Sequence, residues 1–182
     1  MDTSDYRGIL YNFNHPYWQE NEDLIPAINY AIDREAILDA VLLGQGEVAY
    51  GPLQRNRYHD PDAAHYDFNP EKAAELMEMA GCEKAGNRWM RNGEPVGFTL
   101  SASADDQVRI DMAQIAAQQL SEVGLDVKAE VPAGGIDWAG QQCCIIGWGS
   151  PFDADDHTYK VFGTGKGANY SGYSNPEVDR WL

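Results

Sequence analysis

Apolar positions recur along this chain with two different periods. Stretches in which they return every three or four residues predict amphipathic helices, which we expect at 23–32, 34–42, 69–80 and 107–123. Alternating or short continuous apolar runs predict strands, which we expect at 7–13, 95–103, 125–131 and 143–146. Strands and helices that follow one another in this way predict an α/β fold.

Residues with turn and capping preferences mark the ends of these elements. Asp33 and Asn69-Pro70 are typical of helix starts, whereas Gly81 and Gly124 are typical of helix ends. Residues 14–22 carry no clear period and are expected to form a loop before a helix that begins near Asp23. Residues 48–67 are expected to form a long connection that lines a cleft, and residues 87–93 a hairpin.

The most informative stretch is the apolar run 143–146 with the aromatic and acidic loop that follows it. The preceding strand, helix and strand predict a parallel βαβ unit, and the run predicts a further strand of that sheet, buried on both faces. Because ligands of open α/β sheets bind beyond the carboxyl ends of strands, Trp148, Phe152 and Asp153 are candidate binding residues. The alternative is that Trp148 belongs to the core and that the acidic residues cap a turn.

Composition narrows the classes of partner. The chain has 182 residues, 13 basic and 29 acidic, with a net charge of -16, which disfavours nucleic acid and anionic membranes and is compatible with cationic or zwitterionic partners. The three cysteines form no disulfide framework, since adjacent Cys143 and Cys144 would point to opposite faces of a strand. No apolar run has the length of a membrane span, and the N-terminal residues show no secretion signal. Both ends interrupt predicted elements, so we expect a piece of a longer protein.

Several other patterns carry chemistry in some proteins. Residues 163–169 are rich in glycine but lack the order of a phosphate-binding loop, and His59 and His65 have no metal-ligand spacing. Residues 169–173 form an aromatic patch with Tyr170 and Tyr173, and Ser174-Asn175-Pro176 predicts the start of a last helix. Asp153, Asp155, Asp156 and His157 could hold a hard cation in a hydrolase, and an interaction module is a third class of function.

Six pieces of the chain resemble one family, the extracellular solute-binding proteins of ABC importers in the peptide and nickel class. They occur in the family's order across nearly the whole chain: 30–37 (Tyr-Ala-Ile-Asp-Arg-Glu-Ala-Ile), Gly51-Pro52, 68–81, 123–125, Gly147-Trp148-Gly149 and 173–179. The resemblance implies a two-lobed protein that closes around a hinge on its ligand and performs no covalent chemistry. Residues 1–182 would be a single lobe of a type II periplasmic-binding-protein-like fold, with a mixed sheet flanked by helices and Tyr11–Asn14 near the hinge.

The same resemblance implies the ligand contacts and the partners. The implied ligand-binding residues are Trp148, Gly149, Pro151, Phe152, Asp153, Asn169 and Tyr170. An oligopeptide or dipeptide is the expected ligand, and a nickel chelate or another small solute is the alternative. In similar peptide-binding members an Asp shortly after the Gly-Trp pairs with the peptide amine; here Pro151 holds that place and Asp153 follows. In similar nickel importers a ring matching Phe152 flanks the chelate, and a His comes from the loop that matches 163–169, which has none here.

The rest of the expectation concerns the whole protein. We expect delivery of the ligand to a membrane permease and an extracellular or periplasmic location, with a lipid anchor outside this chain. We expect a monomer with no cofactor, no protein-bound metal and no nucleic acid partner.

Overall fold

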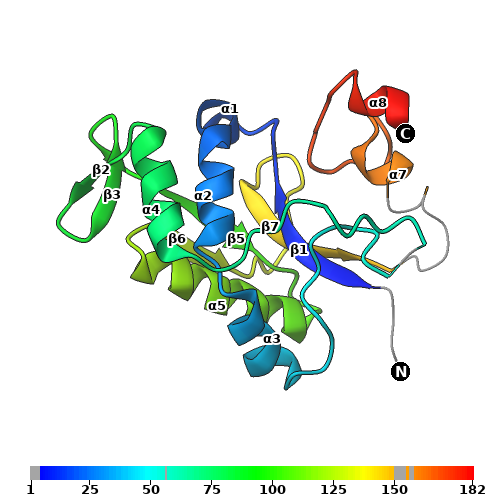
Figure 1. Ribbon diagram of the computed structural model, residues 1–182, viewed down its shortest axis with the longest axis horizontal. Helices are drawn as coiled ribbons and strands as arrows, with labels where there is room; N and C mark the ends of the chain where they lie inside the picture. The colour runs from blue at the N-terminus through cyan, green and yellow to red at the C-terminus, as the bar shows by residue number, and fades with distance from the viewer. Residues whose placement is uncertain (1–4, 56, 150–154, 156–157) are drawn as a thin grey trace.

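A four-stranded mixed sheet with the order β1-β7-β5-β6 forms the centre of the protein (Figure 1). The computed structural model describes residues 5–55, 57–149, 155 and 158–182. The strands are β1 Tyr6–Tyr11, β5 Gly97–Ser101, β6 Asp126–Glu130 and β7 Cys143–Trp148. β5 pairs in parallel with both β6 and β7, which confirms the predicted parallel unit, and β1 pairs antiparallel with β7.

β7 is the strand around which the sheet is built. Its first four residues, from Cys143 to Ile146, are all buried, as expected for a strand covered on both faces. The register pairs Tyr11 with Cys143 and Tyr6 with Trp148, so Trp148 lies at the end of the strand, beside the start of β1. This register brings the N-terminal strand to the carboxyl end of β7.

The sheet shares one hydrophobic core with helices α2 Ile25–Tyr30, α4 Pro70–Met79 and α5 Gln107–Glu122. α5 packs against β6 and β7, α2 packs against α4, and α3 Arg34–Leu42 packs against α5. The starts of α3 and α4 are the predicted ones, because Asp33 and Asn69 accept hydrogen bonds from the main-chain N–H groups of Ala36 and Lys72. α3 ends at Leu42, and Leu43 and Gly44 that follow it both have positive φ angles, of 53° and 72°.

The expected loop at 14–22 is wrong. The chain there forms α1 Pro16–Asn21 and the short helix η1 Glu22–Leu24. His15 caps α1, because its Nδ1 accepts a hydrogen bond from the N–H of Tyr17, and Pro16 occupies the first helical position. Trp18 is completely buried and donates from Nε1 to the carbonyl oxygen of Gln142, so one side chain ties the helix to the sheet.

The predicted hairpin at 87–93 is part of a larger element. A second, three-stranded sheet contains β2 Glu83–Ala85, β3 Arg88–Arg91 and β4 Glu94–Pro95. It lies against the end of α5, where Gly124 has a φ of 105° and passes so close to Asn87 that a Cβ would strike the Asn87 carbonyl. Buried Trp89 fixes this sheet to the core.

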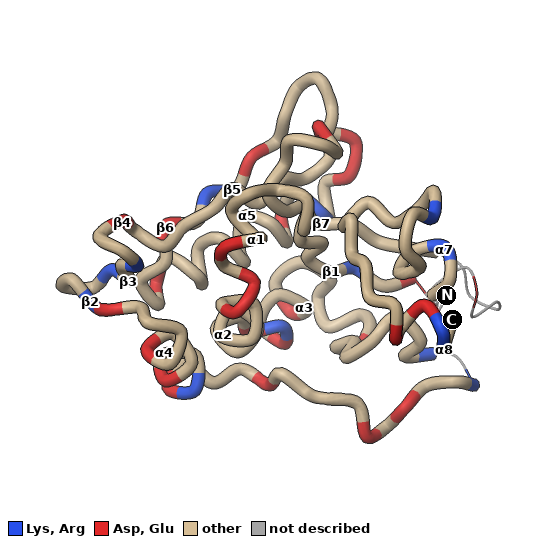
Figure 2. The backbone as a smooth tube through the Cα atoms, turned by 90° about the horizontal axis from the view of Figure 1, so that it is seen from above, with Lys and Arg blue, Asp and Glu red and all other residues tan. Residues whose placement is uncertain are grey.

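The C-terminal part carries the short helices α7 Tyr159–Phe162 and α8 Val178–Trp181. Asn175 begins the last helical turn by accepting hydrogen bonds from the N–H groups of Glu177 and Val178, which agrees with the predicted helix start. Residues 48–55 and 57–67 form no helix or strand and cross in front of β1 (Figure 1). Acidic residues are spread over most elements and outnumber the basic ones (Figure 2).

Candidate functional site

Three aromatic rings stack at the end of β7. The rings of Trp148 and Tyr170 are 5.7 Å apart at an interplanar angle of 12°, and the rings of Trp138 and Tyr170 are 4.6 Å apart at 27°. Trp138 and Tyr170 are 41% and 39% exposed, and Trp148 is half-buried. Tyr170, from a later part of the chain, thus joins the indoles that precede and end β7 into one continuous surface.

The turn that presents Tyr170 is built by the side chain of Asn169. Its Nδ2 donates to the carbonyl oxygens of Gly163 and Tyr173 at 3.0 and 2.8 Å, and its Oδ1 accepts from the Ser171 hydroxyl at 2.8 Å. Asn169 therefore shapes the 163–173 turn. The turn is anchored to the end of β1, because the N–H of Phe13 donates to the carbonyl oxygen of Ser171 at 2.8 Å.

The turn that presents Trp138 is anchored to the same end of β1. The side chain of Asn12, only 1% exposed, donates to the carbonyl oxygens of Ala139 and Gln141 at 3.2 and 2.9 Å. Within the turn, Oδ1 of Asp137 accepts from the N–H of Ala139 at 3.2 Å. Residues 12 and 13 therefore hold both outlying turns, and with them two of the three rings.

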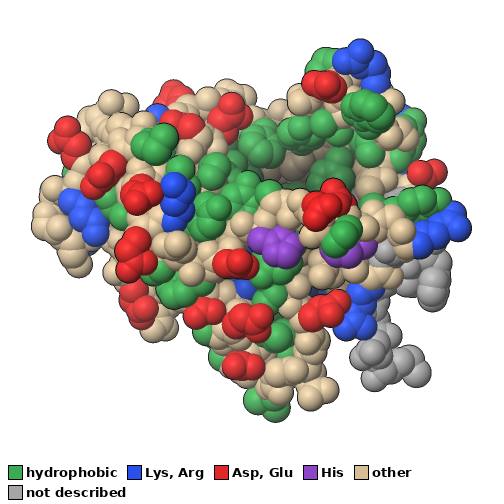
Figure 3. Space-filling view, in the orientation of Figure 1, with side chains coloured by type: hydrophobic (Ala, Val, Ile, Leu, Met, Phe, Trp, Pro, Cys, Tyr) green, Lys and Arg blue, Asp and Glu red, His purple; other side chains and the backbone are tan. Residues whose placement is uncertain are grey.

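A hollow ringed by hydrophobic side chains lies between the part of the molecule that carries α1 and the part that carries α7 and α8 (Figure 3). Phe13 and Tyr173 form another aromatic contact, at 6.0 Å and 60°, in the segments that hold the stack. Exposed aromatic surface of this kind, with a small number of polar groups near it, is typical of ligand-binding sites.

The predicted site residues have different outcomes. Trp148 and Tyr170 are brought into contact, Asn169 supports the turn beside them, and Gly149 is exposed and so close to Asp5 that a Cβ there would strike its carboxylate. Pro151, Phe152 and Asp153 lie outside the described residues, as do Asp156 and His157.

Trp138 as a site residue and Asn12 as its support were not predicted from the sequence. A tryptophan in a polar, glycine-containing segment was the available signal for Trp138, because such a segment offers little core in which to bury the ring. The role of Asn12 depends on a tertiary contact across 127 and 129 residues, and no local pattern reports it.

A larger cleft of about 680 Å³ lies between β1, α3 and the 48–67 connection. It confirms the expectation that this connection lines a cleft, but Trp138, Trp148 and Tyr170 are not among its lining residues. Arg34 holds one wall, since its guanidinium donates to the carbonyl oxygens of Asn29 and Tyr66 at 3.0 and 2.8 Å. Burial lowers the pKa of Arg34. The ion pairs that the structure describes do not include this guanidinium.

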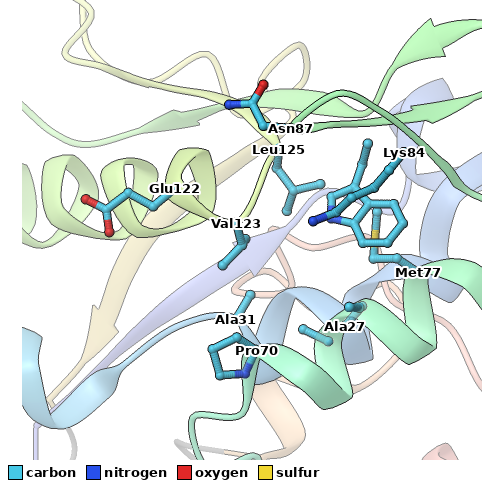
Figure 4. A pocket seen from close by; sticks show the side chains of 12 residues that line it. Ala27, Ala31, Pro70, Met77, Lys84, Asn87, Glu122, Val123 and Leu125 are labelled. Atoms are coloured by element: carbon cyan, nitrogen blue, oxygen red, sulfur yellow. The ribbon is translucent and has the colours of Figure 1, made fainter.

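A smaller pocket of about 200 Å³ lies between α2, α4 and the second sheet. Its inner lining is apolar and includes Ala27, Ala31 and Met77, whereas Glu122 and Asn87 point away from them (Figure 4). The ammonium of Lys84 lies 4.9 Å from the centre of the Trp89 ring beside it. The pocket is an indentation of the core, on elements other than those that carry the aromatic stack.

Within the described ranges, no three His, Cys, Asp or Glu side chains group closely enough to hold a metal ion. No helix in that part of the chain has both the length and the apolar character needed to cross a membrane. The three cysteines are buried free thiols, and burial raises the pKa of Cys144 to about 12, which agrees with their expected role as small apolar residues.

Comparison with known proteins identifies the family. Residues 2–171 match the bacterial extracellular solute-binding proteins, family 5 Middle. The chain belongs to this family, a class of proteins that capture solutes.

Individual relatives agree with this assignment. The oligopeptide-binding protein AppA of Bacillus subtilis is 29% identical over 91% of this chain and 34% of its own length. The structure of NikZ from Campylobacter jejuni in complex with Ni(L-His) matches with a TM-score of 0.90 and 29% identity, over 98% of this chain and 38% of that one. The structure of AppA from Bacillus subtilis in complex with a nonapeptide matches with a TM-score of 0.82 and 28% identity, over the same shares. The chain thus has the expected fold and spans about a third of the length of these relatives.

Proposed function

We propose that this chain is one lobe of a solute-binding component of an ABC importer and that its ligand is an oligopeptide. The observation that carries the proposal is the stack of Trp138, Tyr170 and Trp148, half-exposed at the carboxyl end of a buried strand. In a two-lobed protein such a surface closes over the ligand and excludes water, which strengthens every polar contact inside the cleft. The described part of the site presents aromatic rings supported by amide and main-chain groups, and binding without covalent chemistry is the proposed activity.

A peptide fits this surface because it combines side chains that pack on rings with a main chain that needs polar partners. AppA of Bacillus subtilis, an oligopeptide-binding protein, supports this choice. A nickel chelate is the second candidate, favoured by the likeness to NikZ, whose structure contains Ni(L-His). Flat indoles would pack equally well against the organic part of such a complex.

The proposal extends to the whole protein. We infer an extracellular or periplasmic location, a permease partner in the membrane and a lipid anchor outside residues 1–182. The hinge would lie near Tyr11–Asn14, where β1 ends and the two aromatic turns are attached. Closure would then move the stack as one unit, with Pro151, Phe152 and Asp153 as further proposed contacts.

The first experiment is native mass spectrometry with elemental analysis of the full-length protein, purified without unfolding. A set of bound masses that match short peptides is the expected result. A single organic mass that carries nickel would replace the peptide with the chelate. A full-length protein that binds neither and turns over a substrate would overturn the proposal.

The second experiment removes the ring that β7 contributes to the aromatic stack. Trp148→Ala in the full-length protein is expected to weaken peptide affinity about tenfold, since a packed ring contributes about 1.4 kcal/mol to binding. Phe68→Ala is the matched control, because that ring is 47% exposed and lies outside the stack. Isothermal titration calorimetry measures both, and equal affinities for Trp148→Ala and wild type would exclude a ligand contact by this ring.

A further inference from the structure

Trp138 offers one open ring face at the end of the aromatic stack. Tyr170 covers one of its faces at a ring distance of 4.6 Å, no other ring contact that the structure describes involves Trp138, and the residue remains 41% exposed. The turn that carries it is fixed to buried Asn12 through the carbonyl oxygens of Ala139 and Gln141. The turn therefore holds the main chain of Trp138 in a defined position.

An anionic group stands next to this ring in the chain. Asp137 is exposed, and its Oδ1 is occupied by the N–H of Ala139. None of the ion pairs that the structure describes involves Asp137. Lys166, the cation of the neighbouring 163–173 turn, is already engaged, because its Nζ lies 4.1 Å from the centre of the Tyr159 ring and 2.5 Å from the Tyr159 hydroxyl.

An indole face and a carboxylate together favour a cation. The face of an indole is the negative end of its quadrupole and attracts ammonium and guanidinium groups more strongly than other aromatic side chains do. A carboxylate on the neighbouring residue of the same turn adds a charge-assisted hydrogen bond. The net charge of -16 makes the surrounding potential favourable for the approach of a positive group.

We propose that Trp138 and Asp137 form a subsite for a positively charged side chain, which makes the preferred ligand a peptide with a lysine or arginine. This inference rests on the proposed peptide-binding function and names its substrate class. Trp138 supplies the ring face that covers the cation, Asp137 supplies the countercharge, and Asn12 positions both through the turn.

The test uses the full-length protein and a matched set of tetrapeptides. Each peptide contains alanine and a single lysine at one of the four positions, and the comparison peptides carry norleucine or glutamate there. Norleucine has a straight aliphatic side chain without the charge, so the pair isolates the ammonium. We expect the best lysine peptide to bind about tenfold more tightly than its norleucine counterpart, and the glutamate peptide to bind most weakly.

Two variants assign the preference to the subsite. Trp138→Leu removes the ring face and keeps an apolar side chain, whereas Asp137→Asn keeps the acceptor for Ala139 and removes only the charge. Each is expected to reduce the ratio of lysine-peptide to norleucine-peptide affinity by about threefold or more. This ratio is the readout, because Trp138→Leu also removes a ring of the stack and is expected to weaken both peptides. Thermal unfolding of both variants checks that the fold is intact.

The outcomes separate this inference from the function on which it rests. Equal affinity for lysine and norleucine peptides, or a preference that both variants retain in full, overturns the basic subsite and leaves peptide binding intact. A tighter complex with the norleucine peptide would assign the open face to apolar side chains. Failure to bind any peptide in the set overturns the peptide proposal together with the subsite.

Discussion

Cys143 and Cys144 show how strongly burial controls side-chain chemistry in this protein. Both thiols are completely buried, and burial raises the pKa of Cys144 from 9.0 to about 12. Because only the thiolate is nucleophilic, iodoacetamide at pH 8 is expected to label none of the three cysteines of the folded protein and all three in denaturant. Mass spectrometry counts the labels; rapid modification under native conditions would contradict the burial.

The raised pKa of Cys144 also makes the stability of the fold depend on pH. The unfolded chain loses the Cys144 proton from about pH 9, whereas the folded chain keeps it until about pH 12. Above pH 9 the folded state therefore binds more protons than the unfolded state, so this thiol lowers stability as pH rises toward 12 and has no effect below 9.

At the scale of single residues, the sequence predicted the roles that depend on nearby residues or on hydrophobicity alone. Asp33 and Asn69 were predictable as helix caps, and the cysteines as core residues, since short-range preference and hydrophobicity fix them. The position of Trp148 at a strand end was predictable as well. Its stacking on Tyr170 was not, because the two residues meet only after the 163–173 turn has been attached to β1.

At the scale of elements, one wrong expectation is informative. Residues 14–22 contain a helix whose polar sequence hides its helical period, because Trp18 is its sole buried residue. The cap formed by His15 and Pro16 was the remaining local signal. By contrast, α5 and the parallel pair of β5 and β6 were predicted closely, since a long periodic helix between two apolar runs leaves little ambiguity.

The connection between β1 and the Trp138 turn gives a prediction at this scale. Asn12→Ala removes two side-chain donors and leaves the carbonyl oxygens of Ala139 and Gln141 without them. We expect a loss of about 2–4 kcal/mol in the free energy of unfolding, because buried polar groups are left unpaired. We also expect a weaker near-ultraviolet circular dichroism signal from the aromatic stack.

Urea titration measures the first effect, and Asn87→Ala is the control. Asn87 is an exposed asparagine in the turn between β2 and β3, and the expected change there is below about 0.5 kcal/mol. If Asn12→Ala and Asn87→Ala shift the midpoint equally, Asn12 does not anchor the turn.

At the scale of the whole molecule, charge becomes the dominant feature. If every Lys and Arg paired with one carboxylate, 29 minus 13, or 16, acidic groups would remain. None of the acidic residues that the structure describes is buried, so their mutual repulsion acts across the surface. The net charge can be counted from the sequence alone. The structure adds that, within the described ranges, every carboxylate that contributes to it has contact with solvent.

Stability is therefore expected to rise with salt. Self-repulsion opposes the compact state, and added salt shortens the screening length from about 10 Å at 0.1 M to about 3 Å at 1 M. We expect the unfolding temperature to increase by about 5 °C or more between 0.1 and 1 M sodium chloride, with most of the gain at the lower concentrations. Differential scanning calorimetry measures the shift, and an equal osmolality of sucrose serves as the uncharged control. An unfolding temperature that stays constant or falls would show that the surface charges are already compensated. The same salt series would weaken the proposed lysine preference at Asp137 while it stabilises the fold, because screening reduces repulsion and attraction alike.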